Sequence, residues 1–389
     1  MWIYVWDTEI KWIYLWDTLL KEVYLWDTKI RPTYKPRTFT ISRTEQSNMS
    51  SWWTYSDDAA WLTAWSGDFD DFFWYSAVLL NTSGVETAEM TQSWWVFTGA
   101  MTTLGNITSG DNVMIKFPVR WIKMTKSWST VTLSITDWLG RESEWYQYYA
   151  HSTWTLSNPW TPKDVFYLWA YMWYPSSNVL KSWSGQYPVP LQTQSTLCSY
   201  AKNNWTWYNI SWFYQRMYIA ALYMMKYWNP NSQSVVWMWY VNGSDLVPSW
   251  WTNSQTNATY WTTSKTKQIK LFWLEDRWGN YAEWIWGMYV NSTLYTSLSW
   301  WSWYLSWWEN TWVYLWWTQF LRAIVWNNKW MFAPQSSISS NSYYCDRVYG
   351  GNNLGLASWY YNSNTDAGIF WMEVLQDTGS KSTARLMYL

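Results

Sequence analysis

The sequence predicts an α+β fold in which β-sheet dominates, and three observations lead to this class. Short units with a strand-like pattern fill residues 1–36, and alternating apolar residues recur between residues 112 and 136. Two segments, 191–203 and 211–227, carry apolar residues at three- and four-residue spacing, which is typical of helices. Sheets with two helices in the second half of the chain are therefore expected.

A ten-residue repeat opens the chain as WIYVWDTEIK, WIYLWDTLLK and EVYLWDTKIR. In each unit β-formers precede a Trp-Asp-Thr turn, so each unit is predicted to form a short hairpin. Such short units bury a face only by stacking. Pro32 and Pro36 end the array. The unit resembles the Y-L-G-x-T-x-I/V-R-P repeats near the start of many phage tail proteins, which implies a junction to the tail.

Tryptophan is in excess and glycine is scarce. The chain has 46 Trp and 15 Gly, so Gly is about 4% where about 7% is usual. Many rings lie among turn residues, and Trp228 follows the predicted helix 211–227 at a position that favours the left-handed backbone of Gly. Our hypothesis is that the gene uses an alternative genetic code in which UGA encodes glycine, here read as tryptophan. The alternative is a Trp-rich surface.

The hypothesis makes a distinction that burial can test. Trp278, Trp284 and Trp371 are expected to be genuine and buried. The positions that should be exposed or lie at turns are Trp6, Trp16, Trp26, Trp228 and the pairs Trp52-Trp53, Trp250-Trp251, Trp300-Trp301 and Trp307-Trp308.

Charge and rare residues argue against several function classes. A net charge of −1 offers no basic field for nucleic acid. No apolar run suits a membrane span, and no secretion signal is expected. Cys198 and Cys345 are too few for a disulfide framework or a zinc cluster, and are either buried thiols or one bridge. His151 is expected to be structural or at the surface. We expect no metal, no cofactor and no catalytic residues.

Residues 37–158 are predicted to form a small β-rich domain. Segments 112–120, 121–126 and 129–136 are predicted strands, and Trp128 lies in a hairpin loop where Gly is expected. The acidic residues of this region lack the twelve-residue spacing of a calcium loop, so a solvated acidic loop is favoured. These residues are Asp57, Asp58, Asp68, Asp70 and Asp71.

Residues 159–389 form the third region. An entry strand is predicted over 165–174 and is followed by the two helices. In the second helix the apolar residues fall on one broad face, which should pack in the core against a sheet. This face consists of Phe213, Met217, Ala220, Ala221, Met224 and Tyr227.

Residues 269–290 read IKLFWLEDRWGNYAEWIWGMYV. With Gly at 273 and 286, this segment resembles the G-L-E-D/N-x-W-G-N-V-W-E-W-V-D-G motif of the C-type-lectin-like fold, shared by formylglycine-generating enzymes, retroelement-diversified variable proteins and phage receptor-binding tips. The two Trp residues should anchor a loop whose backbone the polar residues hold. The matched residues are Leu274, Glu275, Asp276, Trp278, Gly279, Asn280, Glu283 and Trp284.

Segments 367–371 and 384–389 resemble the final strands of the same fold. The resemblance covers about the last 230 residues and, more weakly, the first 36. It implies a C-terminal C-type-lectin-like domain, 159–389, with two helices and an irregular antiparallel sheet. A small all-β domain and the short N-terminal β repeats precede it.

Residues 336–366 are rich in Ser, Asn, Tyr and Gly, which is the composition of an antibody-like binding surface. The segment also falls where retroelement-diversified members of the family carry their variable residues. The alternative is a plain polar loop. The expected ligand contacts are Tyr343, Tyr344, Asp346, Arg347, Tyr349, Asn352, Asn353, Tyr360, Tyr361 and Asn362.

The resemblance implies a binding protein and not an enzyme, since nothing around Cys198 or Cys345 matches the cysteine motif of the formylglycine-generating branch. We expect a phage tail-tip or tail-fibre protein of the virion that binds a bacterial surface receptor for host attachment. Its partners would be that receptor and other tail proteins, in a trimer by analogy, without nucleic acid or membrane insertion. The alternatives are a cellular surface adhesin of the same fold and, after it, an enzyme of the formylglycine-generating type.

Overall fold

The computed structural model is an α+β protein rich in sheet, with three α-helices among the described residues. None of the described helices has the length and apolar character needed to cross a membrane. The structure describes residues 14–15, 18–19, 23–25, 28–30, 37–44, 54–61, 72–73, 75–90, 97–98, 109–137, 141–152, 162–172, 174–189, 192–227, 229, 231–236, 247–249, 259–260, 262, 267–297, 308–314, 319–327, 331–336, 347–349, 352–357, 368–370, 372–375 and 382–389.

The second and third N-terminal repeats each form a hairpin. Strand β1 (Tyr14–Leu15) pairs with β2 (Thr18–Leu19), and β3 (Val23–Leu25) pairs with β4 (Thr28–Ile30). Each connection is the two-residue Trp-Asp pair that the repeat pattern predicted to be a turn. The hairpin prediction is therefore confirmed for these units, whereas the first unit lies outside the described residues and stacking stays a prediction.

A four-stranded antiparallel sheet follows, in the order β11-β12-β5-β6. Apolar and hydroxyl side chains alternate along its strands, so that one face packs into the core and the other presents hydroxyls. The predicted hairpin is confirmed, because β11 and β12 are joined by Trp128 and Ser129 alone. The strands are β5 (Thr38–Thr44), β6 (Thr54–Asp57), β11 (Trp121–Ser127) and β12 (Thr130–Thr136).

A seven-stranded sheet joins strands from both sides of residue 158. Its order is β16-β28-β13-β10-β7-β8-β9, and the pair of β10 with β13 crosses the expected boundary between residues 158 and 159. The two regions therefore share one sheet and one continuous core. The strands are β7 (Ser76–Leu80), β8 (Glu86–Met90), β9 (Phe97–Thr98), β10 (Asn112–Pro118), β13 (Val165–Trp169), β16 (Tyr208–Ile210) and β28 (Leu386–Tyr388).

Both predicted helices are present, as α2 (Gln194–Lys202) and α3 (Phe213–Tyr227), and a short α4 (Ser232–Val235) follows. The Thr193 hydroxyl caps α2 by accepting a hydrogen bond from the Thr196 amide. Every residue of α3 is buried, so the helix packs on all sides and not through one face only.

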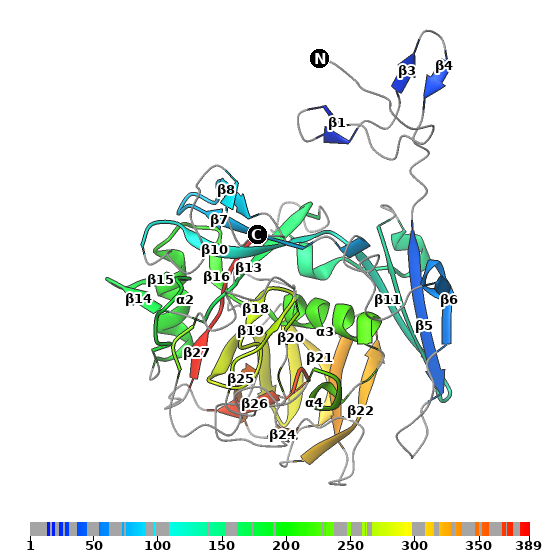
Figure 1. The fold of residues 1–389 in the computed structure, drawn as a ribbon. Helices are drawn as coiled ribbons and strands as arrows, with labels where there is room; N and C mark the ends of the chain where they lie inside the picture. Colours follow the sequence, from blue (N-terminus) through cyan, green and yellow to red (C-terminus); the bar gives the residue numbers. More distant parts are fainter. Residues whose placement is uncertain are drawn as a thin grey trace.

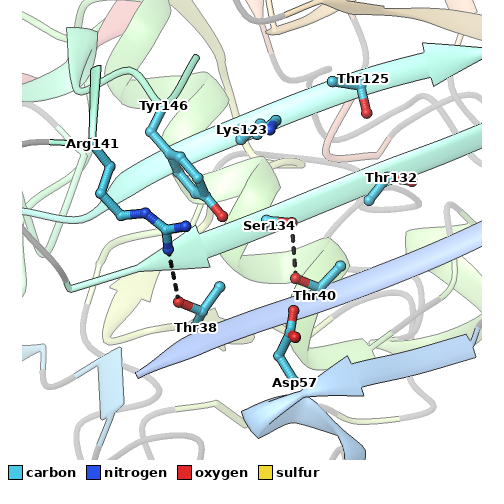
Figure 2. Close-up of a pocket in the computed structure, with 9 residues that line it drawn as sticks. All are labelled: Thr38, Thr40, Asp57, Lys123, Thr125, Thr132, Ser134, Arg141 and Tyr146. Carbon is cyan, nitrogen blue, oxygen red and sulfur yellow. Dashed lines mark hydrogen bonds between the residues drawn. The ribbon is translucent and has the colours of Figure 1, made fainter. Parts of the chain in front are cut away.

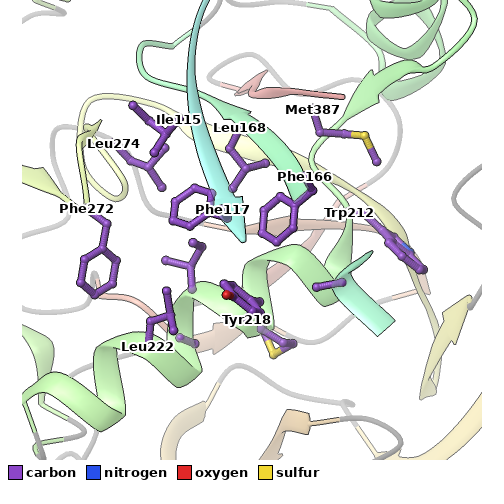
Figure 3. Close-up of a cluster of buried hydrophobic side chains, with 14 of the residues drawn as sticks. Ile115, Phe117, Phe166, Leu168, Trp212, Tyr218, Leu222, Phe272, Leu274 and Met387 are labelled. Carbon is purple, nitrogen blue, oxygen red and sulfur yellow. The ribbon is translucent and has the colours of Figure 1, made fainter. Parts of the chain in front are cut away.

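Figure 1 shows α3 between two layers of strands. On the side of the seven-stranded sheet, Tyr218 of α3 meets Phe117 of β10 and Phe166 of β13, with ring centroids 6.2 and 5.2 Å apart (Figure 3). Strand β19 of the sheet described next contacts α3 from another side. The core of the protein therefore surrounds this helix.

The third sheet has nine strands. Its path is β21-β20-β19-β25-β26-β24-β22-β23, and β27 adds to β19 in parallel. Most neighbours are antiparallel, whereas β24 pairs in parallel with β26. The strands are β19 (Ala282–Asn291), β20 (Thr293–Ser297), β21 (Trp308–Tyr314), β22 (Gln319–Asn327), β23 (Met331–Ser336), β24 (Arg347–Tyr349), β25 (Asn352–Ala357), β26 (Met372–Leu375) and β27 (Ser382–Ala384).

Two predicted strands differ from the structure. The entry strand ends at Trp169, and Tyr174 begins a separate hairpin of β14 (Tyr174–Ser176) and β15 (Val179–Lys181). Residues 368–370, expected in a strand, form a turn. The side chain of Ser232 accepts a hydrogen bond from the Ile369 amide, and Arg216 donates to the Ile369 carbonyl, so side chains replace a neighbouring strand there.

Candidate functional site

The family-like motif forms a buried, tightly turned loop. Strands β17 (Lys270–Leu271) and β18 (Leu274–Glu275) form a hairpin whose two connecting residues, Phe272 and Trp273, both have positive φ. That backbone is typical of a type I′ turn, which favours Gly at its second position. The finding is consistent with Gly at 273, although the Trp273 ring is only 4% exposed.

The two motif tryptophans are fully buried, as expected. Trp278 and Trp284 are 0% exposed, and the Trp284 indole donates a hydrogen bond to the Gln192 carbonyl at 3.1 Å. Asn280 holds another segment, since its side-chain amide both accepts from the Val247 amide and donates to the Val247 carbonyl. The remaining Trp residues named for the burial test, Trp371 included, lie outside the residues or side chains that the structure describes.

Glu283 is the centre of a buried ion cluster. Arg385 and Arg277 donate to its two carboxylate oxygens at 2.8 and 2.7 Å, and Arg216 lies 3.7 Å away. All four side chains are 0% exposed. Burial alone would raise the pKa of Glu283, but the three guanidinium groups hold it below its usual range. The Glu283 carboxylate therefore connects helix α3, the motif loop and the C-terminal strands through ion pairs.

Arg385 joins this cluster to the backbone. Its guanidinium also donates to the carbonyls of Trp169, Ala170, Glu275 and Asp276. Arg385, expected in a final strand, lies between β27 and β28 (Leu386–Tyr388), and no spacing pattern pointed to Arg216 and Arg277 as partners of Glu283. One signal was present, because Arg216 is a charged residue in the first half of a mostly apolar helix.

The pKa of Asp276 is shifted in the opposite direction to that of Glu283. Burial, with the nearby Glu275, raises the pKa of Asp276 well above its usual value, against hydrogen bonds from Asn280 and Gln268. Burial likewise lowers the pKa of Lys270 to about 6. Both shifts have burial as their main cause, since burial disfavours the charged form of each group.

The expected ligand contacts divide between described and undescribed residues. Tyr343, Tyr344, Asp346, Tyr360, Tyr361 and Asn362 lie outside the described residues. Arg347 and Tyr349 belong to β24, and Asn352 and Asn353 begin β25. The backbones of Asn352 and Asn353 pair with Asn291 and Val290, at the far end of β25 from Ala357. The structure therefore does not gather these four residues at one strand end.

Strands β24, β25 and β26 share one row of the sheet near the ends from which the undescribed contact residues continue in sequence. Met372 at the start of β26 pairs with Val348 of β24 on one side and with Ala357, the last residue of β25, on the other. Ala357 in turn pairs with Glu283 of β19. Val348, Met372 and Ala357 thus lie in one row of the sheet with Glu283, the centre of the ion cluster, whereas residues 341–346 and 358–367 lie outside the described residues.

A pocket of about 350 Å³ lies elsewhere, on the hydroxyl face of the four-stranded sheet (Figure 2). Strand register aligns Lys123 with Ser134 and Thr40, and it aligns Thr125 with Thr132. One end is closed by Arg141, which donates to the Thr38 hydroxyl at 3.2 Å and to Glu144 at 2.9 Å. The lining residues are Thr38, Thr40, Asp57, Lys123, Thr125, Thr132, Ser134, Arg141 and Tyr146.

Two of the chemically reactive residues named from the sequence, His151 and Cys198, are buried. His151 is 0% exposed between the rings of Phe166 and Tyr218, and burial lowers its pKa to about 3. Cys198 lies on α2 and is 4% exposed, whereas Cys345 is outside the described residues.

Comparison with protein-family models finds no match, and a search of curated proteins finds no matching relative.

Proposed function

We propose that the chain is a phage tail-tip or tail-fibre protein that attaches to a bacterial surface receptor, a glycan or a protein, through the segments flanking β24 and β25. The observation that carries this proposal is the row of the nine-stranded sheet formed by Val348, Met372, Ala357 and Glu283. In the sequence, the Tyr- and Asn-rich residues 341–346 directly precede β24, and residues 358–367 directly follow β25. A binding surface on a rigid base loses less entropy on association.

The motif loop supplies that base. Its ion cluster and buried tryptophans fix the start of β19, which pairs directly with the end of β25. Two helices before the motif, a buried motif loop and a final core strand are also what the C-type-lectin-like resemblance implies. We therefore assign this domain type as part of the proposal.

The test is binding of the full chain to host cells, with the glycine hypothesis applied by restoring Gly at the suspected positions. A variant with Tyr343, Tyr344, Tyr360 and Tyr361 changed to Ala should lose cell binding and keep its stability, because exposed substitutions cost less than about 0.5 kcal/mol each. Tyr187→Ala is the matched control, since Tyr187 is 58% exposed and lies outside the segment.

Trp284→Ala distinguishes a residue that supports the fold from residues that contact the receptor. It should destabilise the protein by about 3 to 5 kcal/mol, as a buried ring does, while the four-Tyr variant should not. Unchanged affinity of the four-Tyr variant would refute the proposed surface. Reading the gene neighbourhood distinguishes the two settings, because tail genes support the phage protein and an export signal on a longer gene supports a cellular adhesin.

A further inference from the structure

We propose that the pocket on the four-stranded sheet is a second binding site, for a neutral saccharide, which acts independently of the C-terminal contact segment. The pocket is defined by the nine lining residues named above and shown in Figure 2. It lies on strands β5, β6, β11 and β12 and on the segment of Arg141 and Tyr146.

Hydroxyl groups dominate the floor. Thr40 and Ser134 hydrogen-bond to each other at 2.8 Å, which fixes their positions while leaving each oxygen further bonding capacity. Thr125 and Thr132 stand opposite each other, and their side-chain hydroxyls make no hydrogen bond within the described part of the chain. A hydroxyl both donates and accepts, so a row of them matches a ligand whose own groups do both. Sugars are such ligands.

The charges around the pocket balance. Lys123 and Arg141 are positive, and Asp57 and Glu144 are negative. The hydrogen bond between Arg141 and Glu144 lowers the pKa of this carboxyl and raises that of the guanidinium. The charged lining residues are Asp57, Lys123 and Arg141, and the ion pair of Arg141 with Glu144, just outside the lining, brings the local charge to zero. Without a net charge the site has no overall preference for an anion or a cation, whereas charge-assisted hydrogen bonds from the ionised groups strengthen the binding of a neutral polar ligand.

The Arg141 end is rigid and offers further donors. The guanidinium of Arg141 lies 4.6 Å from the ring centroid of Tyr146, and the Lys123 ammonium lies 5.6 Å from it. Burial raises the pKa of Tyr146, so its phenol keeps the proton that it can donate. The volume of about 350 Å³ is at the small end of ligand pockets, which run from about 300 to 1,000 Å³. That size suits one or two sugar units.

The experiment uses the full chain and five probes at millimolar concentration. Saturation-transfer NMR detects binding of the sugars, and line broadening in phosphorus NMR detects binding of inorganic phosphate. Maltose, lactose and N-acetylglucosamine are the neutral sugars, sialic acid is the carboxylated sugar, and inorganic phosphate is the simple anion. We expect at least one neutral sugar to bind. The double variant Thr125→Val, Thr132→Val should weaken its Kd at least tenfold, and Lys123→Met should weaken it too.

The matched control is Thr130→Val, on the same face of β12 but outside the pocket, which should leave the Kd unchanged. The four-Tyr variant of the C-terminal segment should also keep sugar binding, so failure of one site is distinguishable from failure of the other. If no neutral sugar binds, if only sialic acid or phosphate binds, or if both pocket variants retain the Kd, the proposal is wrong.

Discussion

Trp128 offers a direct measure of the strain that a tryptophan introduces at a glycine-like position. It is the first residue of the two-residue loop between β11 and β12, has a φ of 55° and is 97% exposed. A positive φ at that residue alone is typical of a type II′ turn, where Gly is preferred. The exposed ring makes few contacts that a smaller residue would lose.

Replacing Trp128 by Gly should therefore stabilise the protein. A side chain in the left-handed region costs about 1 to 2 kcal/mol, which Gly recovers. Because Gly raises the conformational entropy of the unfolded chain, the gain in stability is lowered by about 0.4 to 1 kcal/mol. The difference is a net gain of about 0 to 1.6 kcal/mol, centred near about 0.8 kcal/mol, and Trp128→Ala, which keeps the strain, should gain nothing.

The assay is denaturant unfolding of the three proteins, followed by circular dichroism, with the midpoints compared at constant slope. A Gly variant that is no more stable than the Ala variant would show that the turn carries no strain. Trp145 and Trp312 also have positive φ, at 69° and 59°, and are 76% and 70% exposed, so the same comparison repeats there. Peptide mass spectrometry of the natural protein then reads the encoded residue directly.

Two further predictions concern buried charge. Glu283→Gln should destabilise the protein by about 3 to 5 kcal/mol, because three buried arginines lose their shared carboxylate, whereas Glu144→Gln at the exposed Arg141 pair should have a much smaller effect on the unfolding midpoint. His151 has a folded-state pKa of about 3 against an ordinary 6.5, so its contribution is complete above pH 6.5 and falls by about 1.4 kcal/mol per pH unit toward pH 3. Unfolding measured between these pH values should be less acid-dependent in His151→Gln, and equal slopes would contradict the reasoning.

Local patterns predicted local structure well in this chain. The β11–β12 hairpin and both long helices follow from spacing and turn residues that lie close together in sequence, whereas the burial of Trp278 and Trp284 is what the resemblance of their motif implied. Predictions of this kind succeed because the deciding interactions are short-range.

Long-range contacts explain what the sequence did not predict. The entry strand stops at Trp169 because the carbonyls of Trp169 and Ala170 accept hydrogen bonds from Arg385, more than two hundred residues later. The pairing of β10 with β13 across the expected domain boundary is likewise invisible to any local pattern. The pocket depends on four strands coming into register, so it too appears only in three dimensions.

Strand β28 has a consequence for how the chain folds. It lies between β13 and β16 in the seven-stranded sheet and pairs with both, so these two strands are joined to each other only through residues 386–388. Residues 386–388 are synthesised after β13 and β16. Until they are present, the edge of β13 with which they pair stays unpaired. Folding should therefore be slow and late, with an exposed strand edge that invites aggregation during synthesis.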